Sequence, residues 1–107
     1  MKKVYLGLLG FGNVGQGLIK ILKARQSLLR HKLGCELVLK KVCDKDLKSK
    51  REISLPKGML TPDAAQVLND PEIDIVIELI GGIHPAKEYV IQAFNNGKYV
   101  VTANKAL

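Results

Sequence analysis

Three glycines near the start of the chain have the spacing of a phosphate-binding turn. They belong to Gly10-Phe11-Gly12-Asn13-Val14-Gly15, a G-x-G-x-x-G pattern that follows an apolar run at Val4–Leu9 and precedes a helix pattern. Gly10 permits a tight turn, Gly12 lets the backbone approach a pyrophosphate, and Gly15 lets the helix pack closely on the strand. The free N–H groups and positive dipole end of the helix would then attract the phosphates. A glycine-rich turn without a ligand is the alternative.

A dinucleotide site also needs an acceptor for the adenine ribose at the end of the second strand. Asp44 occupies that place, although it is further from Gly15 than the usual ~20 residues. The hydrophilic stretch 25–33 extends the crossover and accounts for the excess. Asp44 favours NAD because its charge repels a 2′-phosphate, whereas Lys45, with Lys41 nearby, could hold that phosphate. Both interpretations stay open, as does a third in which Asp44 only caps a turn.

The elements that must position these groups alternate between strand and helix patterns, which indicates an α/β class with a parallel sheet. We expect strands at Val4–Leu9, Glu36–Cys43, Ile73–Leu79 and Tyr99–Thr102, and a short edge strand at Met59 and Leu60. We expect helices at 14–29, 61–69 and 85–96, the first with a buried stripe of Val14, Leu18, Ile21, Leu22, Leu28 and Leu29. Right-handed crossovers then predict a Rossmann-type three-layer sandwich with strand order 3-2-1-4-5.

Composition narrows the function classes. The 107 residues fit one domain, and 17 Lys and Arg against 10 Asp and Glu give a net charge of +7. Six basic residues cluster between Lys40 and Arg51, but no aromatic residue is interleaved with them, so we expect no nucleic-acid partner. No run approaches the ~18 apolar residues of a membrane span, so we expect a soluble, cytoplasmic protein. Cys35 and Cys43 lack metal-ligand spacing, and no metal site is predicted.

Two later segments are more specific than the glycine turn. They are Asp70–Gly82 (D-P-E-I-D-I-V-I-E-L-I-G-G) and Gly97–Leu107 (G-K-Y-V-V-T-A-N-K-A-L). Together with L-G-F-G-N-V-G at Leu9–Gly15, they closely resemble homoserine dehydrogenases over essentially the whole chain. The resemblance implies NAD or NADP as cofactor, and the interconversion of L-aspartate 4-semialdehyde and L-homoserine in the route to threonine and methionine.

The resemblance also assigns roles to residues. It implies cofactor contacts from the glycine turn, from the turn after the third long strand and from the end of the last strand: Gly10, Gly12, Asn13, Val14, Gly15, Gly81, Gly82, Thr102, Ala103 and Asn104. It places Lys105 at the active site, where an ammonium could polarise the aldehyde oxygen or hold the substrate carboxylate. A surface lysine is the alternative. Lys45 stands where many members have an arginine followed by aspartate, so cofactor choice stays open.

Two further polar residues have weaker assignments. Glu78, at the end of a buried strand, could hydrogen-bond loop amides or act chemically, and His84 is expected to be a helix-entry residue. Members of the family have several hundred residues, so we expect residues 1–107 to be an NAD(P)-binding domain without the substrate and dimerisation domain. Such a chain should bind a dinucleotide weakly, lack useful turnover alone, and form a homo-oligomer through an exposed apolar edge or face.

Three other functions remain to be separated from this one. Another Rossmann dehydrogenase acting on a small amino or keto acid would differ in its substrate. A non-enzymatic regulator that senses NAD(H) would bind a dinucleotide tightly with these 107 residues alone. A nucleic-acid binder is suggested only by the net charge and would show salt-dependent binding with no effect of NAD.

Overall fold

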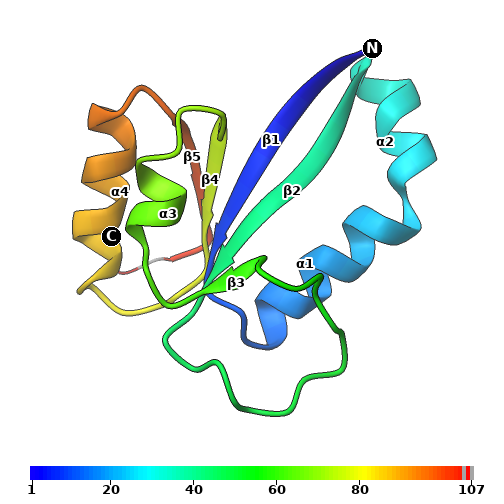
Figure 1. Ribbon diagram of the computed structural model, residues 1–107. Coiled ribbons are helices and arrows are strands. Elements are labelled where there is room, and N and C mark those ends of the chain that lie inside the picture. Colours follow the sequence, from blue (N-terminus) through cyan, green and yellow to red (C-terminus); the bar gives the residue numbers. More distant parts are fainter. Residues whose placement is uncertain (105, 107) are drawn as a thin grey trace.

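The computed structural model describes residues 1–104 and 106, and its centre is a parallel sheet with helices on both sides (Figure 1). The strands are β1 (Lys2–Leu9), β2 (Cys35–Cys43), β3 (Leu60–Thr61), β4 (Ile75–Glu78) and β5 (Tyr99–Thr102). The helices are α1 (Asn13–Ala24), α2 (Gln26–Leu33), α3 (Ala65–Leu68) and α4 (Ala86–Asn95). The strand order is β3-β2-β1-β4-β5 with every pair parallel, which confirms the predicted 3-2-1-4-5 order.

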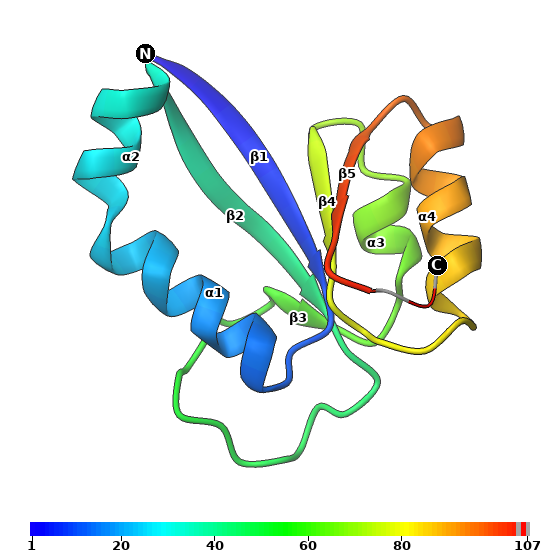
Figure 2. The same ribbon diagram turned by 180° about the vertical axis from the view of Figure 1, so that it is seen from behind.

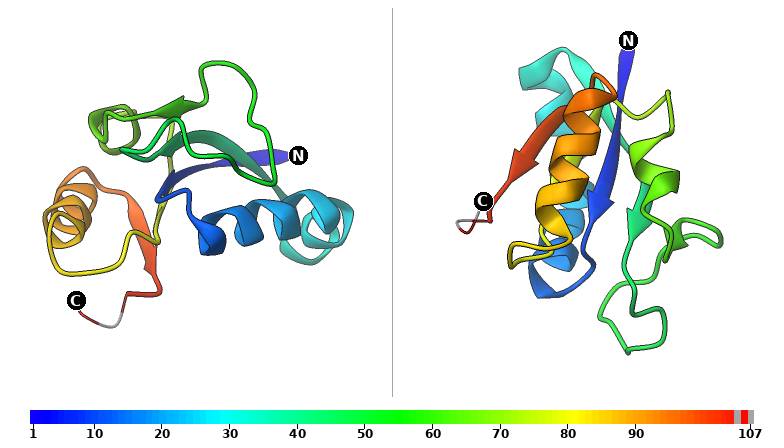
Figure 3. Two further views of the ribbon diagram at one scale, coloured as in Figure 1. Left: turned by 90° about the horizontal axis from the view of Figure 1, so that it is seen from below. Right: turned by 90° about the vertical axis from the view of Figure 1, so that its left-hand side faces the viewer.

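Alternate strand residues enter different cores, which makes the molecule a three-layer sandwich. Leu9 and Cys43 belong to a cluster with residues of α3 and α4, whereas Leu8 and Val42 belong to a second cluster with Ile19 of α1. Successive side chains of a strand point to opposite faces, so these clusters lie on the two sides of the sheet. Figure 3 shows the same arrangement from below, with α1 and α2 on one side and α3 and α4 on the other.

The crossover from β1 to β2 differs from the predicted single helix. The chain forms two helices, α1 and α2, that meet at Arg25, whose φ of −112° and ψ of 20° leave the helical region. Figure 2 shows the bend between them. The predicted buried stripe was partly wrong, because Val14, Ile21 and Leu28 are exposed, and the fully buried apolar residue of α1 is Ile19. The stretch 25–33 does extend the crossover, as predicted, and it does so as α2.

The remaining elements are close to their predicted positions. The edge strand comprises Leu60 and Thr61 rather than Met59 and Leu60, so Thr61 is a strand residue and α3 begins only at Ala65. The Thr61 hydroxyl still accepts a hydrogen bond from the Asp63 N–H at 3.1 Å, and Asp63 in turn accepts one from the Ala65 N–H at 3.0 Å. Residues 61–64 form these turns instead of the first helical turn, so α3 is shorter than the helix predicted at 61–69. In the described part of the chain, no helix has the length and apolarity to cross a membrane.

Candidate functional site

One row of paired residues marks the carboxyl edge of the sheet. The pairs run across all five strands in the order Thr61, Cys43, Leu9, Glu78, Thr102. Each strand ends at this row, so the residues that follow emerge together at one edge. In open α/β sheets, ligands bind in the crevice outside the carboxyl ends of the strands, at the point where the strand order reverses. That point lies between β1 and β4, beside Gly10.

The turn after β1 depends on two of its glycines for its shape. Gly10 has a φ of +107°, and a Cβ there would lie 2.9 Å from the carbonyl carbon and oxygen of Leu79. A Cβ on Gly15 would lie only 2.4 Å from the carbonyl oxygen of Gly10. Because no side chain fits at either place, these glycines let β1, α1 and the end of β4 approach one another closely.

Gly12 has a different role, because among residues 1–104 and 106 a Cβ built on it meets no non-neighbouring atom within 4 Å. It stands at the N-terminus of α1 with ordinary backbone angles (φ −88°, ψ −157°). The first helical hydrogen bond runs from the Gln16 N–H to the Gly12 carbonyl oxygen at 2.9 Å. In the described structure no side chain caps this end of α1, and no acidic residue occupies its first turn. The first N–H groups of α1, among them those of Asn13 and Val14, therefore have no side-chain cap, an arrangement suited to an anion such as a pyrophosphate.

A pocket of about 320 Å³ opens beside the glycine turn. The glycine turn and the end of β2 form one wall, and the end of β4 with the start of α4 forms the other. The lining residues are Gly10, Gly12, Cys43, Asp44, Lys45, Pro62, Leu79, Ile80, Pro85 and Tyr89. Burial raises the pKa of the Cys43 thiol, and the nearby Asp44 and Asp63 carboxylates add to that, so the thiol is a neutral wall group. The mainly apolar lining with a carboxylate and an ammonium at its rim could hold a nucleoside.

Sequence reasoning placed Asp44 and Lys45 at this pocket but missed most of its apolar wall. Pro62 and Tyr89 lie outside the recognised motifs and reach the pocket only through the pairing of β2 with β3 and the packing of α4. The position of Pro62 directly after an edge strand was the available signal. Asp44 also does more than line the pocket: its Oδ2 accepts a hydrogen bond from the Phe11 N–H at 2.7 Å, and its Oδ1 accepts one from the Asp46 N–H at 2.8 Å.

At the other side of Gly10, Glu78 ties together the turns that follow β4 and β5. Its side chain is fully buried, and its Oε2 accepts hydrogen bonds from the N–H groups of Ile80 (2.6 Å) and Gly81 (3.3 Å). Its Oε1 accepts the Thr102 hydroxyl proton at 2.5 Å. These contacts match the loop-amide role considered for Glu78 from its sequence position. They fix the two turns relative to each other.

The same network extends to Asn104. The Thr102 hydroxyl accepts a hydrogen bond from the Asn104 N–H at 2.9 Å, and the Asn104 amide donates to the Gly82 carbonyl oxygen at 2.5 Å. A hollow of about 150 Å³ lies here, lined by Val14, Leu79, Gly81, Ala103 and Asn104. The structure thus brings the predicted residues of three separate segments to one edge. Lys105, the predicted active-site residue, lies outside the described residues.

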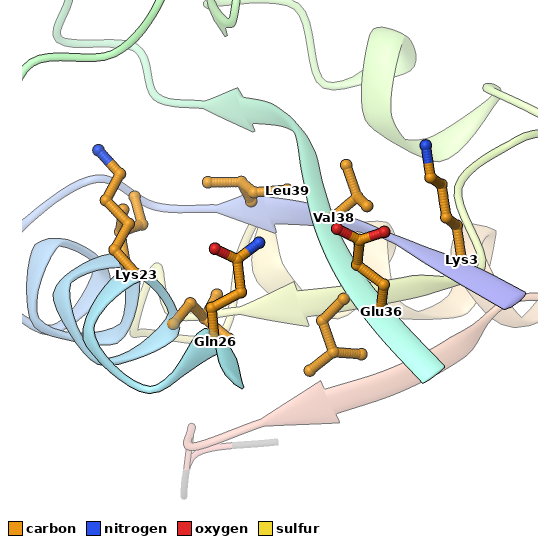
Figure 4. A pocket seen from close by; sticks show the side chains of 9 residues that line it. Lys3, Lys23, Gln26, Glu36, Val38 and Leu39 are labelled. Atoms are coloured by element: carbon orange, nitrogen blue, oxygen red, sulfur yellow. The ribbon is translucent and has the colours of Figure 1, made fainter. Parts of the chain in front are cut away.

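Another hollow is remote from this edge. It measures about 300 Å³ and lies between the two crossover helices and the amino-terminal parts of β1 and β2 (Figure 4). Lys23 and Gln26 line one side, and Lys3, Glu36 and Val38 line the other. The hollow lies beside the strand starts and contains none of the predicted site residues.

The basic segment that suggested nucleic acid is partly engaged within the chain. Lys40 Nζ pairs with Asp70 at 2.6 Å and with Glu72 at 2.9 Å, and these hydrogen bonds raise the pKa of Lys40. Lys41 Nζ donates to the Gly58 carbonyl oxygen at 2.6 Å. Among the residues with described positions, no group of three or more His, Cys, Asp and Glu side chains is arranged to hold a metal ion.

Comparison with known proteins assigns the site to a family. Residues 10–107 match the sequence profile of the homoserine dehydrogenase NAD-binding domain. Over its whole length the chain is 49% identical to the homoserine dehydrogenase of Bacillus subtilis strain 168 and covers 25% of the length of that protein. It is 44% identical to the homoserine dehydrogenase of Methylobacillus glycogenes and covers 26% of its length. The chain therefore spans about a quarter of the length of these relatives.

Solved structures agree with the sequence comparison. The crystal structure of S. aureus homoserine dehydrogenase at pH 6.0 aligns with all of this chain, which covers 28% of the length of that protein. The TM-score is 0.91 and the sequence identity is 37%. The homoserine dehydrogenase of Thiobacillus denitrificans matches 98% of this chain and 24% of its own with a TM-score of 0.90 and 42% identity. The glycine turn, the E-L-I-G-G turn and the T-A-N-K segment all fall within the matched residues, and the chain belongs to the family of homoserine dehydrogenase NAD-binding domains.

Proposed function

We propose that residues 1–107 form the dinucleotide-binding domain of an NAD(P)-dependent homoserine dehydrogenase that interconverts L-aspartate 4-semialdehyde and L-homoserine. The observation that carries the proposal is the start of α1 at Gly12, which no described side chain caps and where an added Cβ would meet no non-neighbouring described atom within 4 Å. The family of the chain supports the proposal, because its name specifies NAD binding.

The residues present fit a dinucleotide along the carboxyl edge of the sheet. The N–H groups at Gly12, Asn13 and Val14 would hold the pyrophosphate, since among the described residues no side chain caps this end of α1. The pocket beside Asp44 would take the adenosine half, with the carboxylate accepting ribose hydroxyl protons. The hollow at Gly81 would face the nicotinamide, which, when bound, would donate a hydride in its reduced form and accept one in its oxidised form.

The network around Glu78 would prepare the nicotinamide end of the site. Because its carboxylate holds both the Gly81 amide and the Thr102 hydroxyl, the two turns present their backbone in one arrangement before a ligand arrives. Such preorganisation lowers the ordering cost of binding. We further propose that Lys105 acts at the reacting carbonyl, a role that the family resemblance supports.

The cofactor assignment is tested by calorimetric titration of the chain with NAD(H) and NADP(H). We expect Asp44→Ala to weaken NAD(H) binding about tenfold, roughly 1.4 kcal/mol, because a ribose acceptor is lost. We expect Lys45→Ala to weaken NADP(H) binding by a similar factor and to leave NAD(H) binding nearly unchanged. Unchanged NAD(H) affinity in Asp44→Ala would show that the ribose is held elsewhere.

The enzymatic assignment needs a separate assay on the complete gene product. Homoserine should be oxidised in the presence of NAD or NADP, and aspartate 4-semialdehyde should be reduced with the reduced cofactor. Turnover of a different small amino or keto acid in place of these two would identify another dehydrogenase. Tight dinucleotide binding without any turnover would instead identify a regulatory module.

We also propose that the chain self-associates through its β5 side. β5 is outermost in the strand order, and Tyr99 and Val101 are 76% and 55% exposed. Such apolar edges pair with other chains. Sedimentation over a concentration series should show an average mass that rises with protein concentration. Val101→Lys should raise the concentration at which association is half complete by about tenfold. Leu33→Lys, an equally exposed residue on α2, is the matched control, and a monomer at all concentrations would contradict the proposal.

A further inference from the structure

Phe11, the second residue of the glycine turn, is held at both of its peptide groups by charged side chains. Its N–H donates to Asp44 Oδ2 at 2.7 Å, and its carbonyl oxygen accepts from Arg51 Nε at 2.7 Å. The Arg51 guanidinium also lies over the Phe11 ring, 4.5 Å from the ring centroid, a cation–π arrangement. The shape of the glycine turn therefore depends on a residue forty positions further along the chain.

The guanidinium is itself fixed in place. Arg51 Nη2 donates to the Asp46 carbonyl oxygen at 2.6 Å, and Nη1 lies 3.4 Å from the Ser49 carbonyl oxygen. The Asp46 carboxylate holds this loop turn by accepting the N–H groups of Lys48 and Ser49. The Arg51 side chain is only 10% exposed, so its charge is poorly screened by solvent. Figures 1 and 2 show the loop after β2 crossing the edge of the sheet where α1 begins.

This fixed charge lies beside the carboxylate that faces the ribose. Arg51 Nη2 is 3.8 Å from Asp44 Oδ2, and Asp44 lines the pocket next to Lys45. An uncompensated aspartate at this position repels the 2′-phosphate of NADP, because two negative charges would approach each other in a partly desolvated site. Here the Arg51 guanidinium offsets the negative charge of Asp44. Each oxygen of the Asp44 carboxylate accepts one backbone N–H, which leaves each a further acceptor position for a ribose hydroxyl.

We propose that Arg51 is a positioning residue that holds the glycine turn through Phe11 and offsets the charge of Asp44, so that the site accepts NADP(H) as well as NAD(H). The proposal rests on the dinucleotide function proposed above. It differs from a direct phosphate contact, because the buried guanidinium uses its donors on the backbone of Phe11, Asp46 and Ser49.

The test is a double-mutant cycle on the ratio of the two affinities. Calorimetry with NADH and NADPH is carried out on the wild-type chain, Arg51→Met, Asp44→Asn and the double variant. Asp44→Asn removes the charge but keeps an oxygen for the Phe11 N–H. We expect Arg51→Met to weaken NADPH binding about tenfold more than NADH binding when Asp44 is present, and to leave the ratio unchanged when residue 44 is asparagine. Lys50→Met, an exposed neighbour that loses the same charge, should leave the ratio unchanged.

Each other outcome contradicts a stated part of the proposal. If Arg51→Met lowered the affinity for NADH and for NADPH by the same factor, the role of Arg51 would be purely structural. A ratio that still falls in the Asp44→Asn background would show that the Arg51 charge acts on the 2′-phosphate itself, independently of Asp44, and would contradict the charge-offset part of the proposal. Hydrogen exchange of the Phe11 amide, measured by NMR without ligand, should accelerate in Arg51→Met. Unchanged protection of this amide would refute the proposal that Arg51 holds the glycine turn through Phe11. If the wild-type chain binds neither nucleotide, the proposed function fails, whatever the exchange result.

Discussion

Replacing Gly12 by alanine is expected to weaken binding of both NAD(H) and NADP(H) at least tenfold while leaving the fold unchanged. The backbone angles of Gly12 suit any residue, and in the described part of the chain a Cβ there meets no non-neighbouring atom within 4 Å, so the folded chain should tolerate the methyl group. The methyl would instead occupy the space through which a pyrophosphate reaches the α1 amides. Calorimetric titration gives the affinity, and urea unfolding gives the stability.

Two other glycines serve as matched comparisons. Gly15→Ala should lower the free energy of unfolding by about 1–3 kcal/mol, because its Cβ would lie 2.4 Å from the Gly10 carbonyl oxygen. Gly17→Ala, inside α1 with open space around its Cβ, should raise stability by up to about 1 kcal/mol and leave binding unchanged. Full affinity in Gly12→Ala would mean that the dinucleotide does not pass over this turn.

Removing the amine of Lys105 is expected to reduce turnover of the complete gene product by about a hundredfold or more, with little change in dinucleotide affinity. The expectation follows from the family resemblance and from the neighbouring Asn104, whose amide holds the Gly82 carbonyl at the nicotinamide end of the site. A positioned proton donor or cation contributes roughly 10²–10⁴-fold to such a step. Steady-state kinetics of homoserine oxidation by Lys105→Ala provide the measurement.

The kinetic constants separate the two roles open to this lysine. A fall in kcat with an unchanged KM would indicate polarisation of the reacting oxygen, whereas a raised KM for homoserine would indicate a contact with the substrate carboxylate. Lys87→Ala, which removes an exposed lysine on α4, is the control and should retain normal kinetics. Normal turnover in Lys105→Ala would remove the lysine from the active site.

The strand order and the glycine turn could be predicted because their signals are local. β1 and β4 are short, mostly apolar runs, with Gly10 directly after β1 and with Gly81 and Gly82 separated from the end of β4 by two residues, and right-handed crossovers then leave few possible orders. The break at Arg25 had no such signal, because neither glycine nor proline marks it. The exposure of Val14 follows from its place in the first turn of α1, beside the proposed pyrophosphate position, where the described elements leave it 65% exposed.

The parts of the site that escaped prediction depend on tertiary contacts. Arg51 belongs to a run of basic residues that reads as a solvated loop, and only the folded chain shows that it packs on Phe11. Tyr89 follows the helical spacing of an ordinary core residue, and its place at the pocket wall depends on how α4 packs beside β4. Periodicity identifies a buried face, but it does not identify which neighbour that face meets.

The row of paired residues from Thr61 to Thr102 has a thermodynamic consequence. The groups proposed to touch a dinucleotide come from segments that begin at Gly10 and end at Asn104, so almost the entire polypeptide must be assembled before any of them can cooperate. A ligand that recognises only the assembled state stabilises it by mass action in proportion to the logarithm of its concentration. Occupancy of this crevice would therefore act as a non-covalent cross-link among five strand ends, which hydrogen bonds and packing hold side by side in the sheet.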